Sequence, residues 1–562
     1  MEWRNAHTGS TVEEIVCAKS GLSVDELLSP AYTSPREIEN LIDAAKLIWK
    51  AVQSKTKITI FGDYDADGIT STTILVKLLR GLGADVSYRL PRRMSEGFGL
   101  SMSAVSEIDS GLLITVDNGV SAIDEIQAAR DKGLSVIVLD HHLPEDGRLP
   151  NANIIVDPHI HPDKNGFENY CGAGLSLKLA EVFLKPGRSL DEFTVYATIG
   201  TIADVMPLIG DNRRIVKKGL DLLSHKKEVI GLGLRVLLNE GKLASTITES
   251  DIAFKVGPLL NAPGRMEDDG AKKAVDLLLS NNVEDSRTQS AYIINTNEAR
   301  KTTVSQAVED AKRAIEAGCL FNMVPLILYL PDVPEGIIGI VTGKLAEEYK
   351  RPCFVFTASH SDPDIYKGSG RTFGGINLKT DLVDPVEGII IRGGGHMGAA
   401  GVSVHKDHFA EMIDVMCNKL SEYESEDTDS ITYDMECTES EIPAICAELE
   451  RFAPYGEGNP SPIFCIRNAT LSPRAGSYYK LLGANSEHLK LLGKNFSAIC
   501  FGMTERYKDM GCPMVVDMVG VLSKNYFQFA SENQMEAMDI KKAQVPTRAT
   551  SLLKALRENG TI

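Results

Sequence analysis

Short apolar runs alternate with helical patterns in the first third of the chain. The runs are Lys57–Phe61, Leu112–Val116, Leu134–Leu139 and Asn153–Val156, each of the length of a buried strand. Between them, apolar residues recur at helical spacing, first over Ile69–Leu82 and again from Ala122. Strands that alternate with helices predict a parallel, doubly wound α/β sheet.

The pattern changes twice further along the chain. Helical periodicity dominates from Ala173 to about Ala317, and a second, smaller α/β unit follows, from Val324 to around Gly401–Val404. From Ile463 onward, short β-type runs are separated by turn residues, which predicts a small all-β barrel.

These changes divide the chain into consecutive segments. We predict an N-terminal helical extension (1–50), a first α/β domain (51–280), a connecting helix (281–320), a smaller α/β domain (321–420), an acidic linker (421–435), an all-β domain (436–545) and a C-terminal tail (546–562).

The charge of the chain at first argues against a nucleic-acid partner. The 562 residues carry a formal net charge of -18, whereas phosphate binding favours a basic surface. However, residues 421–450 hold eleven acidic residues and no Lys or Arg, which leaves -7 for all the rest. Arg89, Arg92 and Arg93 form a local basic cluster, so the location of charge is a better guide than its sum.

Cysteine usage and hydropathy indicate a compartment. The ten cysteines are scattered singly, with no CxxC pair, as expected in a reducing cytosol and unlike a disulfide framework or a zinc site. No apolar run reaches the roughly 18 residues needed to span a bilayer, and the N-terminus lacks the pattern of a secretory signal. We therefore predict a cytoplasmic protein with no membrane partner.

Carboxylates and histidines follow the predicted strands. Asp63, Asp65 and Asp67 come after the first strand, Asp117 after the second, and Asp140-His141-His142 after the third. Since the carboxyl ends of parallel strands meet at one edge of the sheet, these side chains should converge, and Asp204 could join them from a helix. The sequence therefore predicts a site at this edge.

The composition of this site favours a pair of divalent cations. Carboxylates with an imidazole and no thiolate suit Mn²⁺ or Mg²⁺, and the anionic groups are too numerous for one ion. Taken singly, Asp117 or Asp140 could instead be a helix N-cap, and the paired histidines could be surface residues. Their repetition at successive strand ends favours the metal site.

Several motifs resemble a known superfamily. The segments Asp63–Gly68, Val116–Gly119, Asp140–His142 and Gly200–Val205 are similar, in order, to the four motifs of the DHH phosphoesterases. Further segments resemble, within that superfamily, the RecJ family of exonucleases specific for single-stranded DNA. They are Pro91–Gly99, Gly257–Arg265, Lys367–Arg371, Gly393–Gly401, Pro454–Pro460 and His488–Lys490.

The resemblance implies a fold and roles for the residues of the site. The fold would be a DHH domain, a DHH-associated domain and a C-terminal OB-fold. Asp65, Asp67 and His141 would each bind one of two metals, with Asp117 and Asp204 bridging them. Asp63 would be a ligand or lie just behind the ligands, Asp140 would orient the histidines, and His142 would lie against the scissile phosphate.

The resemblance also implies a substrate-binding surface. A pocket for a 5′-phosphate would consist of Arg93, Arg265, Ser369, Gly370 and Arg371, and a glycine loop with Gly394, Gly395 and His396 would contact the substrate. For one arginine alone a surface salt bridge would be an alternative, as would a tight turn for the glycines. In the barrel, the candidates for base stacking and backbone contact are Tyr478, Tyr479, Lys480, His488 and Lys490, although the tyrosines could belong to the barrel core.

The implied function is a two-metal-dependent 5′→3′ exonuclease that degrades single-stranded DNA to nucleoside 5′-monophosphates in recombination and repair. One alternative is a DHH phosphodiesterase for short oligonucleotides or cyclic dinucleotides, and another is a non-catalytic DNA-binding scaffold of the same superfamily. The expected partners are single-stranded DNA, a helicase and a single-strand-binding protein, and the chain is expected to act as a monomer.

Overall fold

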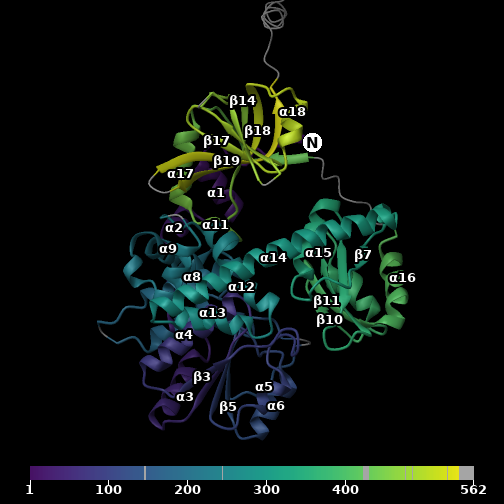
Figure 1. Cartoon of the computed structure of the whole chain (residues 1–562). Helices are drawn as coiled ribbons and strands as arrows, with labels where there is room; N and C mark the ends of the chain where they lie inside the picture. Colours follow the sequence, from purple (N-terminus) through teal and green to yellow (C-terminus); the bar gives the residue numbers. More distant parts are fainter. Residues whose placement is uncertain are drawn as a thin grey trace, which may run out of the picture.

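The computed structural model describes residues 1–144, 147–185, 187–243, 245–421, 430–474, 476–483, 485–527 and 530–543. These residues form three lobes, with the first α/β domain at the bottom of Figure 1, the barrel at the top and the second α/β domain to one side. The predicted C-terminal tail (546–562) and residues 422–429 of the predicted acidic linker lie outside the described residues.

The first α/β domain is built on a five-stranded parallel sheet. Its strand order is β3-β2-β4-β5-β6, which makes β2, β4 and β5 the central neighbours. Residues of β2 and β4 are buried on both faces, as expected for a parallel sheet covered by helices on each side. The strands are β2 (Ile58–Phe61), β3 (Val86–Arg89), β4 (Leu112–Val116), β5 (Ser135–Leu139) and β6 (Ile154–Val156).

Helices cover both faces of this sheet. One face packs against α3, α4 and α7 in a large core that continues into a helical subdomain, whereas the other face packs against the short helices α5 and α6. The helices beside the sheet are α3 (Leu41–Gln53), α4 (Ala66–Gly81), α5 (Met102–Ser106), α6 (Ile123–Asp131) and α7 (Gly172–Val182). Those of the subdomain are α8 (Asp191–Ala203), α9 (Gly210–His225), α10 (Leu232–Glu240), α11 (Glu249–Asp251), a π-helical turn (Ile252–Val256), α12 (Gly257–Met266) and α13 (Gly270–Leu279).

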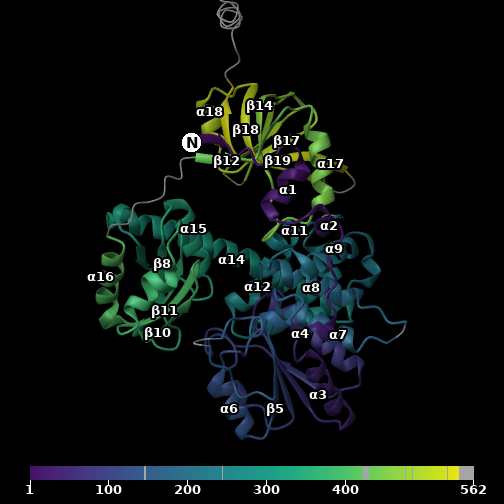
Figure 2. The same ribbon diagram turned by 180° about the vertical axis from the view of Figure 1, so that it is seen from behind.

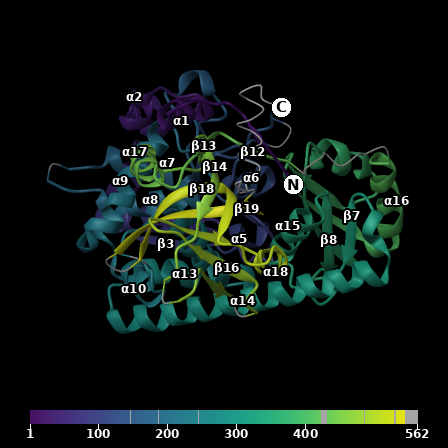
Figure 3. The same cartoon turned by 90° about the horizontal axis from the view of Figure 1, so that it is seen from above.

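A 35-residue helix, α14 (Val283–Ala317), joins the two α/β domains. Seen from above, it runs along one side of the molecule from the helical subdomain to the second domain (Figure 3). That domain contains a five-stranded sheet of order β10-β11-β9-β8-β7, in which only β7 and β8 are parallel. Its elements are β7 (Leu326–Tyr329), α15 (Ile338–Tyr349), β8 (Cys353–Ala358), β9 (Ile365–Arg371), β10 (Arg392–Gly395), β11 (Ala399–His405) and α16 (Phe409–Lys419).

The C-terminal domain is a seven-stranded sheet with its own core. The strand order is β13-β14-β18-β19-β17-β16-β15, and α17 packs against the same core. Its elements are β13 (Met435–Cys437), α17 (Ile442–Phe452), β14 (Ile463–Thr470), β15 (Tyr479–Leu482), β16 (His488–Leu492), β17 (Ser497–Cys500), α18 (Thr504–Asp509), β18 (Val515–Phe527) and β19 (Ala530–Lys542).

The N-terminal segment differs from the predicted helical extension. Residues Glu2–Asn5 form a strand, β1, which pairs in parallel with β12 (Ser430–Tyr433), a strand inside the segment predicted as linker. Burial explains this pairing, because Trp3 is covered and its indole N–H donates to Asp539 at 2.8 Å. The helices that follow, α1 (Val12–Ser20) and α2 (Val24–Leu28), pack against α17, as Figure 2 shows from behind.

One buried arginine joins the barrel to the first domain. Arg213 on α9 is completely buried and donates to the carbonyl groups of Leu27, Phe452, Ala453 and Pro454. It therefore connects the helical subdomain, the N-terminal segment and the barrel at a single point. Over the described residues, no helix is both long and apolar enough to cross a membrane.

Candidate active site

The first aspartate cluster lies where β2 leads into α4. Asp65 is the N-cap of α4, because its Oδ1 accepts hydrogen bonds from the backbone N–H groups of Asp67 and Gly68 at 3.0 and 3.1 Å. The side chain of Asp67 is held in turn by the start of α7. Its two oxygens accept from the N–H groups of Gly172 and Ala173 at 2.6 and 2.9 Å. The carboxylate is thus stabilised by a helix N-terminus.

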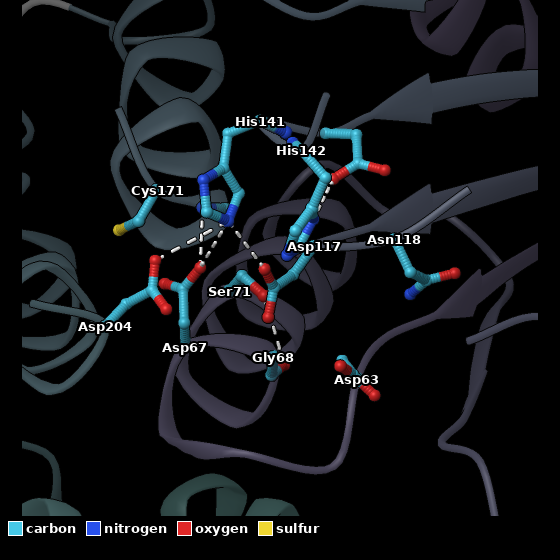
Figure 4. Close-up of polar contacts among 12 residues, drawn as sticks. Asp63, Asp67, Gly68, Ser71, Asp117, Asn118, His141, His142, Cys171 and Asp204 are labelled. Atoms are coloured by element: carbon cyan, nitrogen blue, oxygen red, sulfur yellow. Dashed lines mark hydrogen bonds and ion pairs between the residues drawn. The ribbon is translucent and has the colours of Figure 1, made fainter. Parts of the chain in front are cut away.

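The next two strands supply an aspartate and a histidine. Asp117 follows β4 and His141 follows β5, and both side chains are buried. The Nε2 atom of His141 lies 3.0 Å from an oxygen of Asp117, 3.6 Å from Asp204 and 4.0 Å from Asp67. Figure 4 shows these three carboxylates gathered below the imidazole ring.

The donor atoms fall into overlapping sets of a size that suits a metal ion. In the first set, made of Asp67, His141 and Asp204, one donor atom from each residue lies within 4.8 Å of the others. A second set consists of Asp63, Asp65 and Asp117, and a third joins Asp117 to the two histidines. Carboxylate oxygens and imidazole nitrogens in adjacent sets fit two hard divalent cations.

The carboxylates are crowded, and the positive charges of His142 and Arg93 offset their mutual repulsion only in part. Burial, together with the charge of Asp65, raises the pKa of Asp63 to about 7. Burial and the neighbouring Asp67 raise the pKa of Asp204 to about 8, and burial with Asp67 holds the pKa of Asp117 well above its usual range. Anionic groups that repel one another in this way would be stabilised by bound cations.

The two histidines have opposite protonation tendencies. Burial and the adjacent His142 lower the pKa of His141 to about 4, so its ring is neutral and able to act as a metal ligand. His142 is half exposed, and its Nδ1 lies 2.7 Å from Oδ1 of Asp140. Although burial opposes its charge, this contact raises the pKa of His142 to about 10.

Asp140 is oriented by the backbone around it. Its oxygens accept from the N–H groups of Val120, His141 and His142 at 2.8, 2.8 and 3.3 Å. Despite its burial, its pKa is lowered, since His142 stabilises the ionised form. Asp117 is not an N-cap, because α6 begins after Ala122. Asp140 does not lead directly into a helix either, since residues 141–144 are non-helical.

Two glycines allow the helices to approach the site closely. A Cβ atom at Gly200 on α8 would lie 2.4 Å from Oδ1 of Asp67, and one at Gly172 on α7 would lie 2.8 Å from Cβ of Asp117. Gly200 belongs to the motif Gly200–Val205, but neither its packing against Asp67 nor the role of Gly172 was predicted. The Gly-Ala-Gly run at Gly172 and the glycine four residues before Asp204 were the available signals.

A second cluster consists of arginines from both α/β domains. Arg93 stacks on Tyr64, the residue between two of the aspartates, with its guanidinium carbon 4.7 Å from the ring centre. Arg265 on α12 donates to the carbonyl of Gly336 in the second domain at 3.3 Å. Burial and the nearby Arg93 lower the pKa of Arg265. The arginines therefore lie together at the junction of the two domains.

The second domain contributes Ser369, Gly370 and Arg371 from the end of β9. Arg371 donates to the hydroxyl oxygen of Ser369 at 3.1 Å, and a Cβ atom at Gly339, in the first turn of α15, would lie 3.0 Å from each side chain. Burial lowers the pKa of Arg371. Within the described residues, no carboxylate forms an ion pair with Arg93, Arg265 or Arg371. These three arginines could therefore bind an anion.

The predicted glycine loop lies two strands away from this cluster. Gly395 on β10 pairs with Ala400 on β11, which pairs in turn with Gly370 on β9. Gly394 and His396 are on the same edge strand or just beyond it, and His396 accepts a hydrogen bond from the N–H of Gly398. The loop is thus on the same sheet as Arg371, and among the described residues no hydrogen bond or ion pair joins it to the arginines.

Comparisons with known proteins decide the family. The chain is 32% identical over 510 residues to the single-stranded-DNA-specific exonuclease RecJ of Haemophilus influenzae, covering 85% of this chain and 86% of the relative. The chain belongs to the RecJ family. Sequence profiles of the family match in three places, with the DHH family N-terminal domain at 57–205, the DHHA1 domain at 323–422 and the RecJ OB domain at 433–539.

Solved structures of RecJ support the same fold. The structure of RecJ from Thermus thermophilus in complex with Mn²⁺ is 26% identical, covers 97% of this chain and 80% of its own, and superimposes with a TM-score of 0.76. The corresponding complex with Mg²⁺ gives a TM-score of 0.72 at 25% identity. The predicted fold class is confirmed, and the choice of Mn²⁺ or Mg²⁺ is confirmed at the level of the RecJ family.

The predicted contact residues of the barrel differ in their exposure and in their partners. Tyr478 and Tyr479 pack partly against the barrel core, and the ring of Tyr479 meets that of the buried Tyr507. Lys490 forms an ion pair with Glu532 at 2.7 Å, whereas Lys480 is exposed. The tyrosines thus take part in barrel packing, the alternative that the sequence left open.

Two further features near the site were not predicted as site residues, although one of them, Phe98, belongs to the motif Pro91–Gly99. Asp157 and His159 follow β6, and Nδ1 of His159 lies 2.7 Å from the carbonyl oxygen of His141. The rule that strand ends converge would have found them. The second is Phe98, whose ring is 71% exposed and contacts both Tyr64 and Arg93.

Proposed function

We propose that this RecJ-family chain is a metal-dependent exonuclease that degrades single-stranded DNA from its 5′ end. The observation that carries this proposal is the pairing of two sites. A cluster of carboxylates and one neutral imidazole suits two cations, and a group of arginines lies close by, with no ion pair to a carboxylate among the described residues. Tyr64 connects them, since it lies between Asp63 and Asp65 and stacks on Arg93. The product would be a nucleoside 5′-monophosphate, and the role would be in recombination and repair.

The residues that would hold the cations follow from the donor sets. Asp67, His141 and Asp204 would hold one ion, and Asp63, Asp65 and Asp117 the other. His141 brings Asp117 and Asp204 to either side of one ring nitrogen, which supports a bridging role for these two aspartates. When bound, two such ions activate a water molecule and neutralise charge on the phosphate.

His142 would contribute a positive charge to the reaction. Its Nδ1–H donates to Asp140, so the opposite ring nitrogen, Nε2, can carry a proton toward solvent. With a pKa raised to about 10, this proton is retained at neutral pH. His142 can therefore donate a hydrogen bond to a non-bridging oxygen of the scissile phosphate. Asp140 would act as a positioning residue.

The arginine cluster would set the polarity of degradation. Arg93, Arg265 and Arg371 present guanidinium groups, Ser369 a hydroxyl, and α15 its N-terminal amides, all of which suit a terminal phosphate. A strand end anchored there would present its first phosphodiester to the metal site. Gly394, Gly395 and His396 would contact the strand from the neighbouring edge, and the exposed ring of Phe98 could stack on a base.

Two alternatives fit the observations less well. A phosphodiesterase for short oligonucleotides or cyclic dinucleotides needs no barrel, whereas residues 433–539 match the RecJ OB domain. A non-catalytic scaffold would not need seven acidic and imidazole side chains in overlapping sets of a size that suits metal ions. Both alternatives make different predictions for activity on long single strands.

Labelled DNA tests the proposal directly. We would present 5′- and 3′-labelled single strands and blunt duplex with Mn²⁺ or Mg²⁺, and repeat each reaction with EDTA. We expect immediate release of the 5′ label as mononucleotide from single strands only. The variant Asp117→Ala should lose turnover by about 10²-fold or more and keep most of its DNA binding, since the proposed strand contacts lie elsewhere. Degradation that starts at the 3′ end would overturn the proposal.

The partners and the compartment are further proposals. A helicase would produce the single strand that such an enzyme consumes, and a single-strand-binding protein would cover it. The chain would act as a monomer, since both proposed sites are assembled within one copy. All ten cysteines are free thiols, which supports the cytoplasm.

A further inference from the structure

Val205 directly follows the proposed metal ligand Asp204, and its conformation is strained. Its φ angle is 56°, in the left-handed region, where a β-branched residue is an outlier. Its side chain is 68% exposed, so burial within the protein does not compensate for the strain.

The strain arises from the way α8 ends. The N–H of Val205 donates to the carbonyl of Ile202 at 3.1 Å, and the N–H of Met206 donates to the carbonyl of Thr201 at 3.1 Å. This pair of bonds defines a Schellman motif, in which the left-handed position is usually glycine. A glycine at position 205 would form the same turn without strain. The turn itself thus gives no reason for a valine at this position.

The segment after Val205 leads from the metal centre to the barrel. Three residues further on, the N–H of Leu208 donates to the carbonyl of Glu457 at 2.7 Å, and a Cβ atom at Gly458 would lie 3.0 Å from Ile209. Val205 is one peptide unit, about 3.8 Å, from Asp204, and at most about 11 Å from Leu208. It thus lies between the site where the strand would be cut and the domain that would hold it.

We propose that Val205 is a substrate-contacting residue, whose isopropyl group packs against the base or deoxyribose of the strand between the barrel and the metal centre. Single exposed apolar residues are common and need no explanation. Here the exposed group is also strained and adjacent to a metal ligand, and an outlier of this kind points to function. This inference rests on the proposed action on single-stranded DNA.

Three variants of the full chain separate substrate contact from strain. Val205→Gly removes both the side chain and the strain, Val205→Asn tolerates the left-handed conformation but is polar, and Val205→Ile keeps a β-branched apolar group. Lys55→Gly is the matched control, because Lys55 is also in the left-handed region (φ 55°) but precedes β2, at the opposite end of the strand from the aspartates. We would measure the melting temperature, the Kd for a single-stranded oligonucleotide in EDTA, and kcat and KM with Mn²⁺.

We expect Val205→Gly and Lys55→Gly to melt at a higher temperature than the unmodified chain. Val205→Gly and Val205→Asn should bind DNA about tenfold more weakly, the loss that corresponds to an apolar contact of two methyl groups. KM should rise by a similar factor with little change in kcat, whereas Val205→Ile and Lys55→Gly should bind as the unmodified chain does. Unchanged Kd and KM in both Val205→Gly and Val205→Asn would overturn the inference.

Three oligonucleotides, each with a single abasic site at the first, second or third nucleotide, distinguish a contact with a base from a contact with a sugar. If Val205 touches a base, one of these strands should reduce binding by the unmodified chain to the level of Val205→Gly. If it touches the sugar, the difference between the two proteins should persist for all three strands. Failure of the unmodified chain to bind or degrade single strands would instead contradict the proposed function, which is a separable result.

Discussion

Single residues at the metal centre combine a structural and a chemical task. Asp65 caps α4 and also belongs to a donor set, so the helix begins where the ligand is needed. Asp67 is held by two backbone N–H groups, which orient its oxygens without a competing cation. Because the compensation comes from backbone amides, the carboxylates remain available for metal ions.

The same crowding predicts how the stability of the metal-free protein depends on pH. Asp63 and Asp204 have pKa values raised to about 7 and about 8 in the folded state, whereas both are ionised in the unfolded chain at neutral pH. The folded state therefore binds more protons, and stability falls as pH rises through these values. His142, with a pKa raised to about 10, acts in the same direction.

We expect the melting temperature in EDTA to fall between about pH 7 and about pH 9, corresponding to a loss on the order of 1 kcal/mol or more. Excess Mn²⁺ should raise the melting temperature most at the higher pH, since ligands must be deprotonated. Calorimetry with and without Mn²⁺ checks both effects. A melting temperature that rises with pH in EDTA would contradict the assigned crowding.

The arginine cluster permits a test of end recognition at the level of one side chain. Arg371→Ala removes a guanidinium that has no carboxylate partner among the described residues. We expect the preference for a 5′-phosphate over a 5′-hydroxyl end to fall by about 10- to 100-fold, the effect of losing a hydrogen bond between charged groups. Degradation rates on the two kinds of strand give the ratio, and an unchanged ratio would exclude Arg371 from the pocket.

Helix packing decides whether the ligands can meet. α7 and α8 both approach Asp67, and the contact is possible because Gly172 and Gly200 have no side chains. At Gly200 an added Cβ atom would lie 2.4 Å from Asp67 and 2.6 Å from Cβ of Ala173. The sequence motif at residues 200–204 therefore encodes close packing as well as a proposed ligand.

Gly200→Ala should disturb both functions. We expect a loss of about 1–3 kcal/mol in the free energy of unfolding, as in other overpacked cores, together with weaker Mn²⁺ binding. Melting temperatures measured at increasing Mn²⁺ concentrations report both the stability of the variant and its affinity for Mn²⁺. The matched control is Gly81→Ala, another helical glycine, which is exposed and has no atom within 4 Å of the added Cβ. It should be neutral or stabilising by about 0.5–1 kcal/mol. Equal behaviour of the two variants would contradict this account.

For the whole molecule, specific contacts hold the domains together. The barrel is tied to the first domain through Arg213 and to the N-terminus through β1 and Trp3. The second α/β domain is joined by α14 and by the contact of Arg265 with Gly336. The proposed phosphate pocket therefore exists only when the two α/β domains are in place.

Arg213→Met tests the link to the barrel. It would remove the hydrogen bonds of Arg213 to four carbonyl groups, although those of Phe452 and Pro454 keep a bond from Asn459, and we expect a loss of about 1–3 kcal/mol. Proteolysis near Phe452 should become faster, and degradation of long strands should slow more than that of short oligonucleotides. Arg287→Met, at an exposed position on α14, should change none of these measurements. Unaltered proteolysis in Arg213→Met would show that the barrel is held by other contacts.

The sequence by itself determined the class of the fold and predicted the residues that the structure gathers into the donor sets. Apolar runs that alternate with helical patterns specify a parallel sheet, because the strands of such a sheet are buried on both faces. Side chains that follow the carboxyl ends of these strands then converge at one edge. The tertiary structure decided what depends on contacts between distant segments. Trp3 pairs with a strand more than 400 residues away, and Gly200 matters only because Asp67 lies against it. The strain at Val205 became apparent only from its backbone φ angle. The sequence does not reveal which residue at the end of α8 adopts the left-handed conformation.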